Sequence, residues 1–124
     1  MDSSVFLAIP KEYHILETSS FFVVRDRFPV SPGHSLIISK SLRRDYFELS
    51  EAERIELAEA IILTKENIDK MYGPDGYNLG MNCGMAAGQT IFHFHCHVIP
   101  RFQGDMINPE GGIRHCIPEK GYYR

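Results

Sequence analysis

The stretch from Ile91 to Ile99 constrains this chain more than any other, because apolar and histidine residues alternate along it without a break. Residues two apart on a β-strand project from the same face, with a rise of about 3.3 Å per residue. The pattern therefore predicts a strand with one apolar face, which packs on the core, and one histidine face, which points away from it. The apolar set is Phe92, Phe94, Cys96 and Val98, and the histidine set is His93, His95 and His97.

Other β-rich runs lie at 13–17, 21–25 and 35–39, and a fourth at 77–83 precedes the histidine strand. The first three have no helix-length insert between them, and a parallel crossover needs a dozen or more residues. They therefore predict an antiparallel meander. Residues 101–124 contain glycines and prolines and show no periodicity, which predicts an extended tail.

One long helix is predicted from Ser50 to Tyr72. Ser50 and Glu53 have the spacing of a capping box, and Gly73-Pro74 ends the helix. A single apolar stripe is expected to pack on the sheet, formed by Ile55, Ala58, Ile62, Ile68 and Tyr72. With a short helix expected within 41–49, the fold class is α+β: a five-stranded antiparallel meander sheet, one long and one short helix, and a C-terminal tail. Residues 1–124 are expected to form a single domain.

Composition excludes several classes of function. Thirteen Lys+Arg against sixteen Asp+Glu give a net charge of −3 with histidine neutral, which argues against a nucleic-acid partner. No run approaches the ~20 apolar residues of a membrane span, so no membrane association is expected. The three cysteines include no CxxC pair, which argues against a disulfide framework and predicts a cytoplasmic location.

Two kinds of chemistry suit a row of three imidazoles. The first is a metal site, in which zinc would need a further ligand from elsewhere. The candidates for that ligand are Cys83, His34, His115 and Cys116. Against a metal site, the chain has no HExxH, and no glutamate follows the second histidine at the spacing that a cupin-type site uses.

The second is nucleophilic catalysis at phosphorus, in which one imidazole forms a covalent intermediate and its neighbours handle protons. The small-residue segment 84–90 directly precedes the strand. Its glycines allow close approach of backbone N–H groups to phosphate oxygens, and Gln89 and Thr90 add an amide and a hydroxyl.

The residues of this second alternative also resemble a known family. His93 to Ile99 is similar to the His-φ-His-φ-His-φ-φ signature of the histidine triad (HIT) superfamily, and Asn82-Cys83-Gly84 with Ala87 to Ile91 resembles its upstream segment. Asp26 to Ile38 resembles the family's Asp/Asn-x-x-Pro-x-x-x-Gly-His segment. Because His97 stands where the nucleotidyltransferase branch has glutamine, the chain resembles the hydrolase branches, which include histidine triad nucleotide-binding proteins and diadenosine polyphosphate hydrolases.

The resemblance implies an enzyme that cleaves at the α-phosphate of adenine-type purine nucleotide conjugates, such as dinucleoside polyphosphates or nucleoside phosphoramidates. His95 would form a nucleotidyl-histidine, and water would then release a nucleoside monophosphate. His97 would contact the phosphate and the leaving group, and His93 would orient the ring of His95. Asp26 would hold the ribose, and apolar residues near Phe6 and Val24 would enclose the base. The residues expected around the phosphate are Asn82, Gly88, Gln89 and Thr90.

The resemblance further implies a homodimer, in which a second copy extends the sheet and the segment 111–120 reaches toward the partner. No cofactor or metal is expected to be required, beyond any divalent ion that arrives on the substrate phosphates. Ile38-Ser39-Lys40 lacks the family's Pro and His, and no N-terminal CxxC is present, which argues against a structural zinc. The alternative function is a nucleotide-binding or scaffold protein with little turnover.

Overall fold

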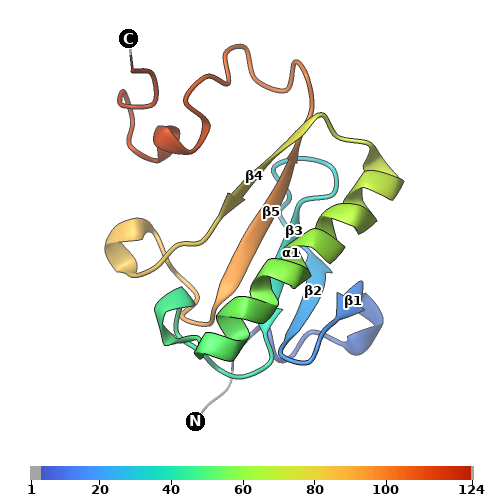
Figure 1. The fold of residues 1–124 in the computed structure, drawn as a ribbon. Helices are drawn as coiled ribbons and strands as arrows, with labels where there is room; N and C mark the ends of the chain where they lie inside the picture. Colours follow the sequence, from blue (N-terminus) through green and yellow to red (C-terminus); the bar gives the residue numbers. More distant parts are fainter. Residues whose placement is uncertain (1–3, 124) are drawn as a thin grey trace.

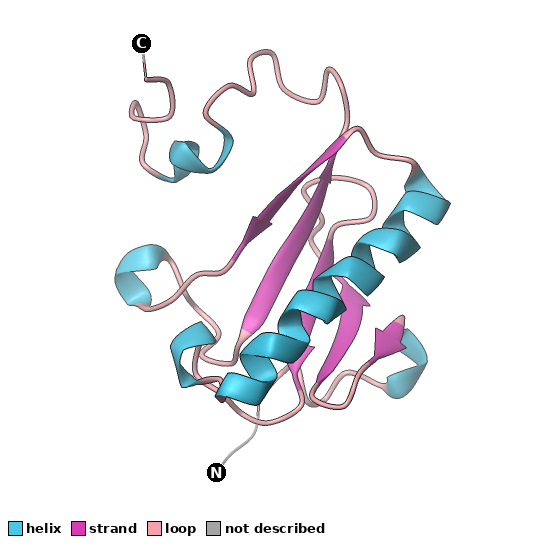
Figure 2. Cartoon of the chain, viewed as in Figure 1, coloured by secondary structure: helices cyan, strands magenta, loops and turns pink. Residues whose placement is uncertain are grey.

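The computed structural model describes residues 4–123, in which five strands and one long helix carry the fold (Figures 1 and 2). The strands are β1 Leu16–Glu17, β2 Phe21–Arg25, β3 Ser35–Ser39, β4 Gly76–Gly80 and β5 His95–Arg101, and the helix is α1 Glu51–Tyr72. The 3-10 turns are η1 Lys11–Tyr13, η2 Tyr46–Glu48, η3 Met85–Ala87 and η4 Gly112–Cys116. The predicted α+β class is confirmed, and η2 is the short helix expected within 41–49.

The strands form one antiparallel sheet in the order β1-β2-β3-β5-β4. The first three strands make the predicted meander. Helix α1 then carries the chain across the sheet to its far edge, where β4 begins, and β5 returns between β3 and β4 (Figure 1). The meander ends at β3 because a helix, and not a tight turn, follows that strand.

The two faces of the sheet are covered by different parts of the chain. Val23, Ile37 and Cys96 are cross-strand neighbours and belong to the core under α1. The opposite face carries two rows, Phe22-Ile38-His95 and Val24-Leu36-His97. The apolar members of these rows pack with Phe6 of the N-terminal segment. The catalytic histidine candidates of β5 therefore lie on the face away from the helix.

Helix α1 has the predicted ends. The Ser50 hydroxyl accepts a hydrogen bond from the Glu53 backbone N–H at 3.1 Å, and the Ser50 N–H donates to the Glu53 carboxylate at 2.7 Å. Gly73 closes the helix in the left-handed conformation, at φ 58° and ψ 51°. That conformation favours glycine because a Cβ would be strained there.

The predicted buried stripe of α1 is largely wrong. Ile55 and Ile62 are 69% and 49% exposed, and Ala58 and Tyr72 are exposed too. The buried positions are Glu53, Leu57, Ala60, Thr64 and Ile68, so that only Ile68 was placed correctly. The helix has apolar residues on two sides, and its buried side contains polar groups with partners. The Thr64 hydroxyl donates to the Ala60 carbonyl at 2.7 Å, and Glu53 pairs with Arg43 at 3.0 Å.

The strand boundaries differ from the predictions at three places. The run 13–17 yields only the two-residue β1, and the run 77–83 yields β4 at 76–80. The histidine strand begins at His95, not Ile91, because the Phe94 N–H donates to the Arg43 carbonyl at 2.6 Å, outside the sheet. The strand continues through Pro100, although proline has no N–H to donate. None is needed toward β3, because Pro100 lies beyond Ser35–Val98, the last pair between β3 and β5.

The C-terminal tail folds back on itself beside β4 (Figure 1). The Arg114 guanidinium donates to the carbonyls of Lys120 and Gly121, and the His115 ring donates to the Glu110 carbonyl at 2.8 Å. The tail has no strand, but it is not the extended segment that was predicted, because its own hydrogen bonds and the turn η4 close it on itself. Within residues 4–123, no helix has the length and apolar character needed to cross a bilayer.

We predict that Ser50→Ala lowers the free energy of unfolding by about 1 kcal/mol, because the Glu53 N–H loses its acceptor. Ser50→Asp keeps an acceptor at the same place and should remain close to wild type. Chemical denaturation measures both. Equal stabilities of the two variants would contradict the role given to this cap.

Candidate active site

A cavity of about 630 Å³ opens on the sheet face opposite α1. Its polar lining contains all the predicted site residues except His93 and Gln89, namely Asp26, Asn82, Gly88, Thr90, His95 and His97. Val5, Ile9 and Val24 are among its apolar lining residues. The size lies within the range of small-molecule sites, and convergent polar groups in a largely apolar cleft are typical of them.

The proton position on His95 follows from its partner. The His95 Nδ1 lies 2.8 Å from the His93 carbonyl oxygen. A carbonyl only accepts, so Nδ1 carries the hydrogen and Nε2 keeps a free lone pair. The ring of Phe6 packs edge-on against His95, with centroids 4.8 Å apart. The neutral form of His95 therefore carries its proton on Nδ1 and leaves the Nε2 lone pair free, which is the form of a nitrogen nucleophile.

His93 differs from the expected arrangement. Its ring is fully buried and does not line the cavity, and its Nε2 donates to the Ser39 carbonyl at 2.7 Å. Burial lowers the pKa of His93, and its Nδ1 has no hydrogen-bond partner. The hydrogen bond that orients the His95 ring is therefore accepted by the backbone carbonyl of His93, and the ring of His93 takes no part in it.

His97 receives a hydrogen bond from a histidine outside the predicted set. The Val30 N–H donates to the His34 Nδ1 at 3.1 Å, which places the His34 proton on Nε2. That Nε2 lies 2.9 Å from the His97 Nδ1. His97 accepts there, and its own proton is on Nε2. Burial, with help from His95 and His34, lowers the pKa of His97 to about 4, against an opposing effect of Asp26. His97 is therefore a neutral hydrogen-bond donor at neutral pH.

His34 was not among the predicted site residues, although its position in the sequence carried a signal. It precedes β3 and shares the alternation of Leu36 and Ile38, which pair with His97 and His95. It therefore belongs to the histidine face of the sheet. It is 3% exposed, and burial lowers its pKa.

Asp26 lies at the edge of this histidine pair. One carboxylate oxygen accepts from the Phe28 N–H at 2.8 Å, which anchors the side chain in the loop after β2. The other lies 3.4 Å from the His34 Nε2 and 3.9 Å from the His97 Nδ1. The carboxylate thus borders both the imidazole pair and the cavity.

Asp26, His34 and His97 are also the one group within residues 4–123 whose spacing could hold a metal ion. The hydrogen bonds argue against that use. Val30 donates to the His34 Nδ1, so the Nε2 that would have to bind the metal carries the proton. A histidine binds metal through an unprotonated nitrogen. Cys83, His115 and Cys116, which were candidates from the sequence, do not belong to this group.

The loop before β5 corrects the expectation for Gln89. This side chain is 4% exposed, and its carbonyl oxygen accepts from the Gly84 N–H at 2.8 Å. Its amide nitrogen donates to the carbonyls of Arg44 and Ile91. The amide therefore braces the loop and has no group free for a phosphate. Gly88, with φ +91°, and Thr90 remain exposed at the cavity.

The segment Arg43-Arg44 connects three parts of the site. The Arg44 carbonyl holds the Gln89 amide at 2.7 Å, and the Arg43 carbonyl holds the Phe94 N–H at the entry to β5. The Arg43 guanidinium pairs with Glu53 in the first turn of α1 at 3.0 Å. The loop and the histidine strand are thereby tied to the N-terminus of the helix.

Residues 9–104 match the HIT domain family. The chain belongs to the HIT family. It is 37% identical over 100 residues to the adenylylsulfatase HINT3 of Arabidopsis thaliana. The aligned region covers 81% of this chain and 51% of that protein. This HIT chain spans about half to two thirds of the length of the first curated relatives it matches.

Solved HIT structures have the same fold. A hypothetical histidine triad nucleotide-binding protein from Sulfolobus tokodaii strain 7 is 39% identical, with a TM-score of 0.71 over 74% of this chain and 62% of that one. A zinc-bound histidine triad family protein from Mycobacterium smegmatis is 31% identical, with a TM-score of 0.75 over 86% of this chain and 80% of that one. The predicted family and fold are therefore confirmed.

The neutral His97 leads to a pH prediction. Its pKa is near 4 when folded and about 6.5 when unfolded, so the unfolded state binds more protons as the pH falls below 6.5. Its contribution to stability is complete above pH 6.5 and is lost as the pH falls toward 4. Between pH 7 and pH 5.5 this histidine should cost the native state about 1 kcal/mol. Urea denaturation measures the free energy of unfolding at both pH values. Its decrease from pH 7 to pH 5.5 should be smaller by about 1 kcal/mol in His97→Gln than in wild type. Equal pH dependence of the two proteins would contradict the prediction.

Proposed function

We propose that this HIT protein hydrolyses purine nucleotide conjugates at the α-phosphate. The observation that carries the proposal is the pair of fixed tautomers at the cavity. The His95 Nε2 has a free lone pair and the His97 Nε2 has a proton, and the two rings are adjacent, with centroids 5.4 Å apart. One ring can attack phosphorus while its neighbour donates a hydrogen bond to the same phosphate or to the leaving group.

In the first step, the His95 Nε2 forms a bond to the α-phosphorus, and the bond from phosphorus to the leaving group breaks. The electron pair of that bond departs with the leaving group, which His97 contacts through its Nε2–H; a phosphate leaves as its anion, and an amine takes up a proton from solvent as it leaves. The exposed Thr90 and Asn82 offer a hydroxyl and an amide at the same cavity for the phosphate oxygens. Because the His95 Nδ1–H stays bonded to the His93 carbonyl, the positive charge that develops on the ring is next to a carbonyl dipole.

In the second step, water attacks the phosphorus of the nucleotidyl-histidine. The phosphorus–nitrogen bond breaks, its electron pair returns to the His95 Nε2, and the water proton passes to solvent. The products are a nucleoside monophosphate and the original neutral imidazole. Asp26 borders the cavity as an acceptor for ribose hydroxyls, and the apolar residues Val5, Ile9 and Val24 receive the base.

The names of relatives support this reaction class. Besides the adenylylsulfatase HINT3, a Schizosaccharomyces pombe relative is named asymmetrical bis(5'-nucleosyl)-tetraphosphatase, and it is 32% identical over 78 residues, covering 63% of this chain and 43% of that protein. We propose purine nucleoside polyphosphates and phosphoramidates, the adenosine compounds among them, as substrates, with no metal required beyond one carried on substrate phosphates. A cytoplasmic location is part of the same proposal, based on the unpaired cysteines.

We expect His95→Ala to lower the rate of AMP release at least about a thousand-fold, because the nucleophile is lost while the cavity remains. The assay compares a dinucleoside polyphosphate with an adenosine phosphoramidate, with and without chelator, and mass spectrometry of quenched wild-type protein detects the nucleotidyl adduct. His115→Ala, in the tail outside the cavity, is the matched control and should keep wild-type turnover.

The alternative function, a nucleotide-binding or scaffold protein with little turnover, uses the same cavity. It predicts that wild type and His95→Ala bind AMP equally, that neither releases product, and that no adduct forms. Those results would replace the hydrolase proposal with the binding-protein alternative. A different result would overturn the metal-independent step. In that result, a chelator abolishes wild-type turnover, an added divalent ion restores it, and no nucleotidyl adduct forms while the chelator is present.

We also propose that a second copy of the chain pairs with the edge strand β4. No strand within residues 4–123 pairs with the outer side of β4, and unpaired edges associate readily. Leu79 and Met81 are exposed at this edge. The hydroxyl of Tyr77 in β4 donates a hydrogen bond to Asp69 of α1, so this side of the helix lies next to β4. The exposed Ile62 and Ile55 lie on the same side of the helix as Asp69. An apolar surface therefore runs from β4 onto the flank of α1.

The dimer predicts a mass twice the 14.2 kDa of the chain in multi-angle light scattering. Ile62→Glu should shift the protein to monomer, because a charge is introduced into the apolar surface. Phe47→Glu is the control, since Phe47 is 76% exposed on η2, outside both β4 and α1, and it should leave the mass unchanged. A wild-type monomer at micromolar concentration would refute the proposal.

A further inference from the structure

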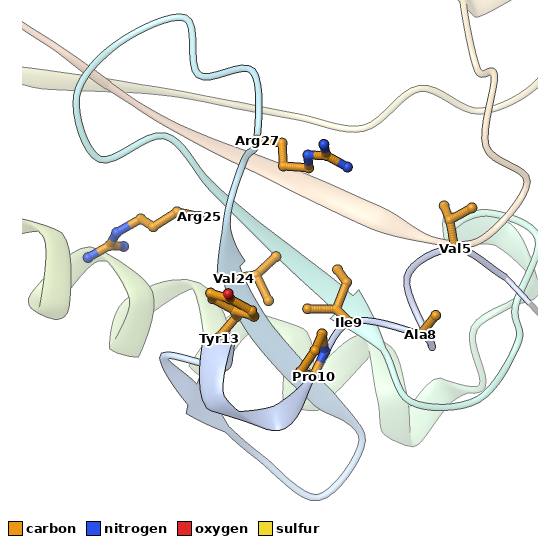
Figure 3. Close-up of a pocket in the computed structure, with 8 residues that line it drawn as sticks. All are labelled: Val5, Ala8, Ile9, Pro10, Tyr13, Val24, Arg25 and Arg27. Atoms are coloured by element: carbon orange, nitrogen blue, oxygen red, sulfur yellow. The ribbon is translucent and has the colours of Figure 1, made fainter.

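The apolar end of the histidine cavity continues into a second cavity of about 610 Å³ (Figure 3). The two share Val5, Ile9, Val24 and Arg27 among their lining residues. A nucleotide with its α-phosphorus at His95 has its base at this apolar end, because the polar groups for phosphate and ribose are near the histidines. The base-recognition groups of the proposed enzyme are therefore found among these shared residues.

Arg27 is the cationic side chain available at that end. It is exposed, and its guanidinium carbon lies 5.7 Å from the centroid of the Phe28 ring. No carboxylate of residues 4–123 pairs with it within salt-bridge distance. Arg27 therefore has its five N–H donors free.

Arg25 also lines both cavities but is already engaged. Its guanidinium donates to the Ser35 hydroxyl at 2.7 Å and to the Asn67 side chain of α1 at 2.6 Å. Figure 3 shows Arg25 extending away from Val24 and Ile9, while Arg27 extends over the side where Val5 lies. The charge that a bound base would meet is that of Arg27.

We propose that Arg27 makes the site select guanine over adenine, as a refinement that rests on the proposed function. Guanine presents two adjacent acceptors, O6 and N7, which match the paired donors of a guanidinium. Adenine presents one acceptor, N7, beside the amino donor N6, so one Arg27 donor faces another donor. The apolar residues Val5, Ile9 and Val24 hold either purine ring by contact alone. Discrimination between the purines therefore depends on Arg27.

The test pairs turnover with equilibrium binding. The kcat/KM of guanosine and adenosine 5'-phosphoramidates is measured for wild type, Arg27→Met and Arg44→Met, and the binding of GMP and AMP is measured by calorimetry. Methionine keeps most of the apolar stem and removes the donors. Arg44→Met is the control for charge: Arg44 holds Gln89 through its backbone carbonyl, which the substitution retains, and its guanidinium lies over the Phe92 ring and lines neither of these two cavities.

We expect wild type to favour guanosine over adenosine by about ten-fold or more in both measurements. The ratio should fall to about one in Arg27→Met, through weaker guanosine binding, and stay at the wild-type value in Arg44→Met. Equal affinity for both purines in wild type would overturn the inference, and so would an unchanged ratio in Arg27→Met. Equal losses for both purines would identify Arg27 as a general anion contact and overturn it too. Preferential GMP binding without turnover would uphold the inference while the hydrolase proposal fails.

Discussion

The antiparallel pairing of β5 with β3 is the constraint on which the rest of the structure depends. Because α1 crosses the sheet and delivers β4 to the outer edge, β5 returns into the interior of the sheet beside β3. That register places His97 opposite Leu36 and His95 opposite Ile38. It also brings His34, at the start of β3, within hydrogen-bond distance of His97. Two histidines of one strand and one of its neighbour thus meet through backbone pairing alone.

Backbone groups then determine the tautomers of the neutral histidine rings. Carbonyl and amide groups of His93 and Val30 cannot exchange donor and acceptor roles, so each fixes the tautomer of the imidazole that it contacts. Burial keeps His97 neutral and so preserves the arrangement over a wide range of pH. Two rings of the same chemical type are therefore adjacent in opposite tautomers, because the Nδ1 of His95 contacts a backbone carbonyl and the Nδ1 of His97 contacts the Nε2 of His34.

The sequence predicted those features whose determinants are local. The ends of α1 follow from Ser50, Glu53 and Gly73, and the histidine face follows from strict alternation. The buried side of α1 was mispredicted, since Thr64 and Glu53 are buried through hydrogen bonds with partners that periodicity does not reveal. The binding role expected of Gln89 left out its bonds within the chain, which join it to the nearby Gly84 and Ile91 and to the Arg44 carbonyl 45 residues away. Hydrogen bonds of buried polar residues, within the helix for Thr64 and across the chain for Gln89, were the information missing from the pattern.

The Arg43-Arg44 segment has a consequence for how the molecule opens. It holds the loop of Gly84 to Thr90 and the entry to β5 through single carbonyl groups, and it is itself held by Glu53 at the frayable end of α1. Helix ends open more readily than sheet interiors. A local opening at this end would free the loop of Gly84 to Thr90 and the entry to β5 together while the five strands stay paired.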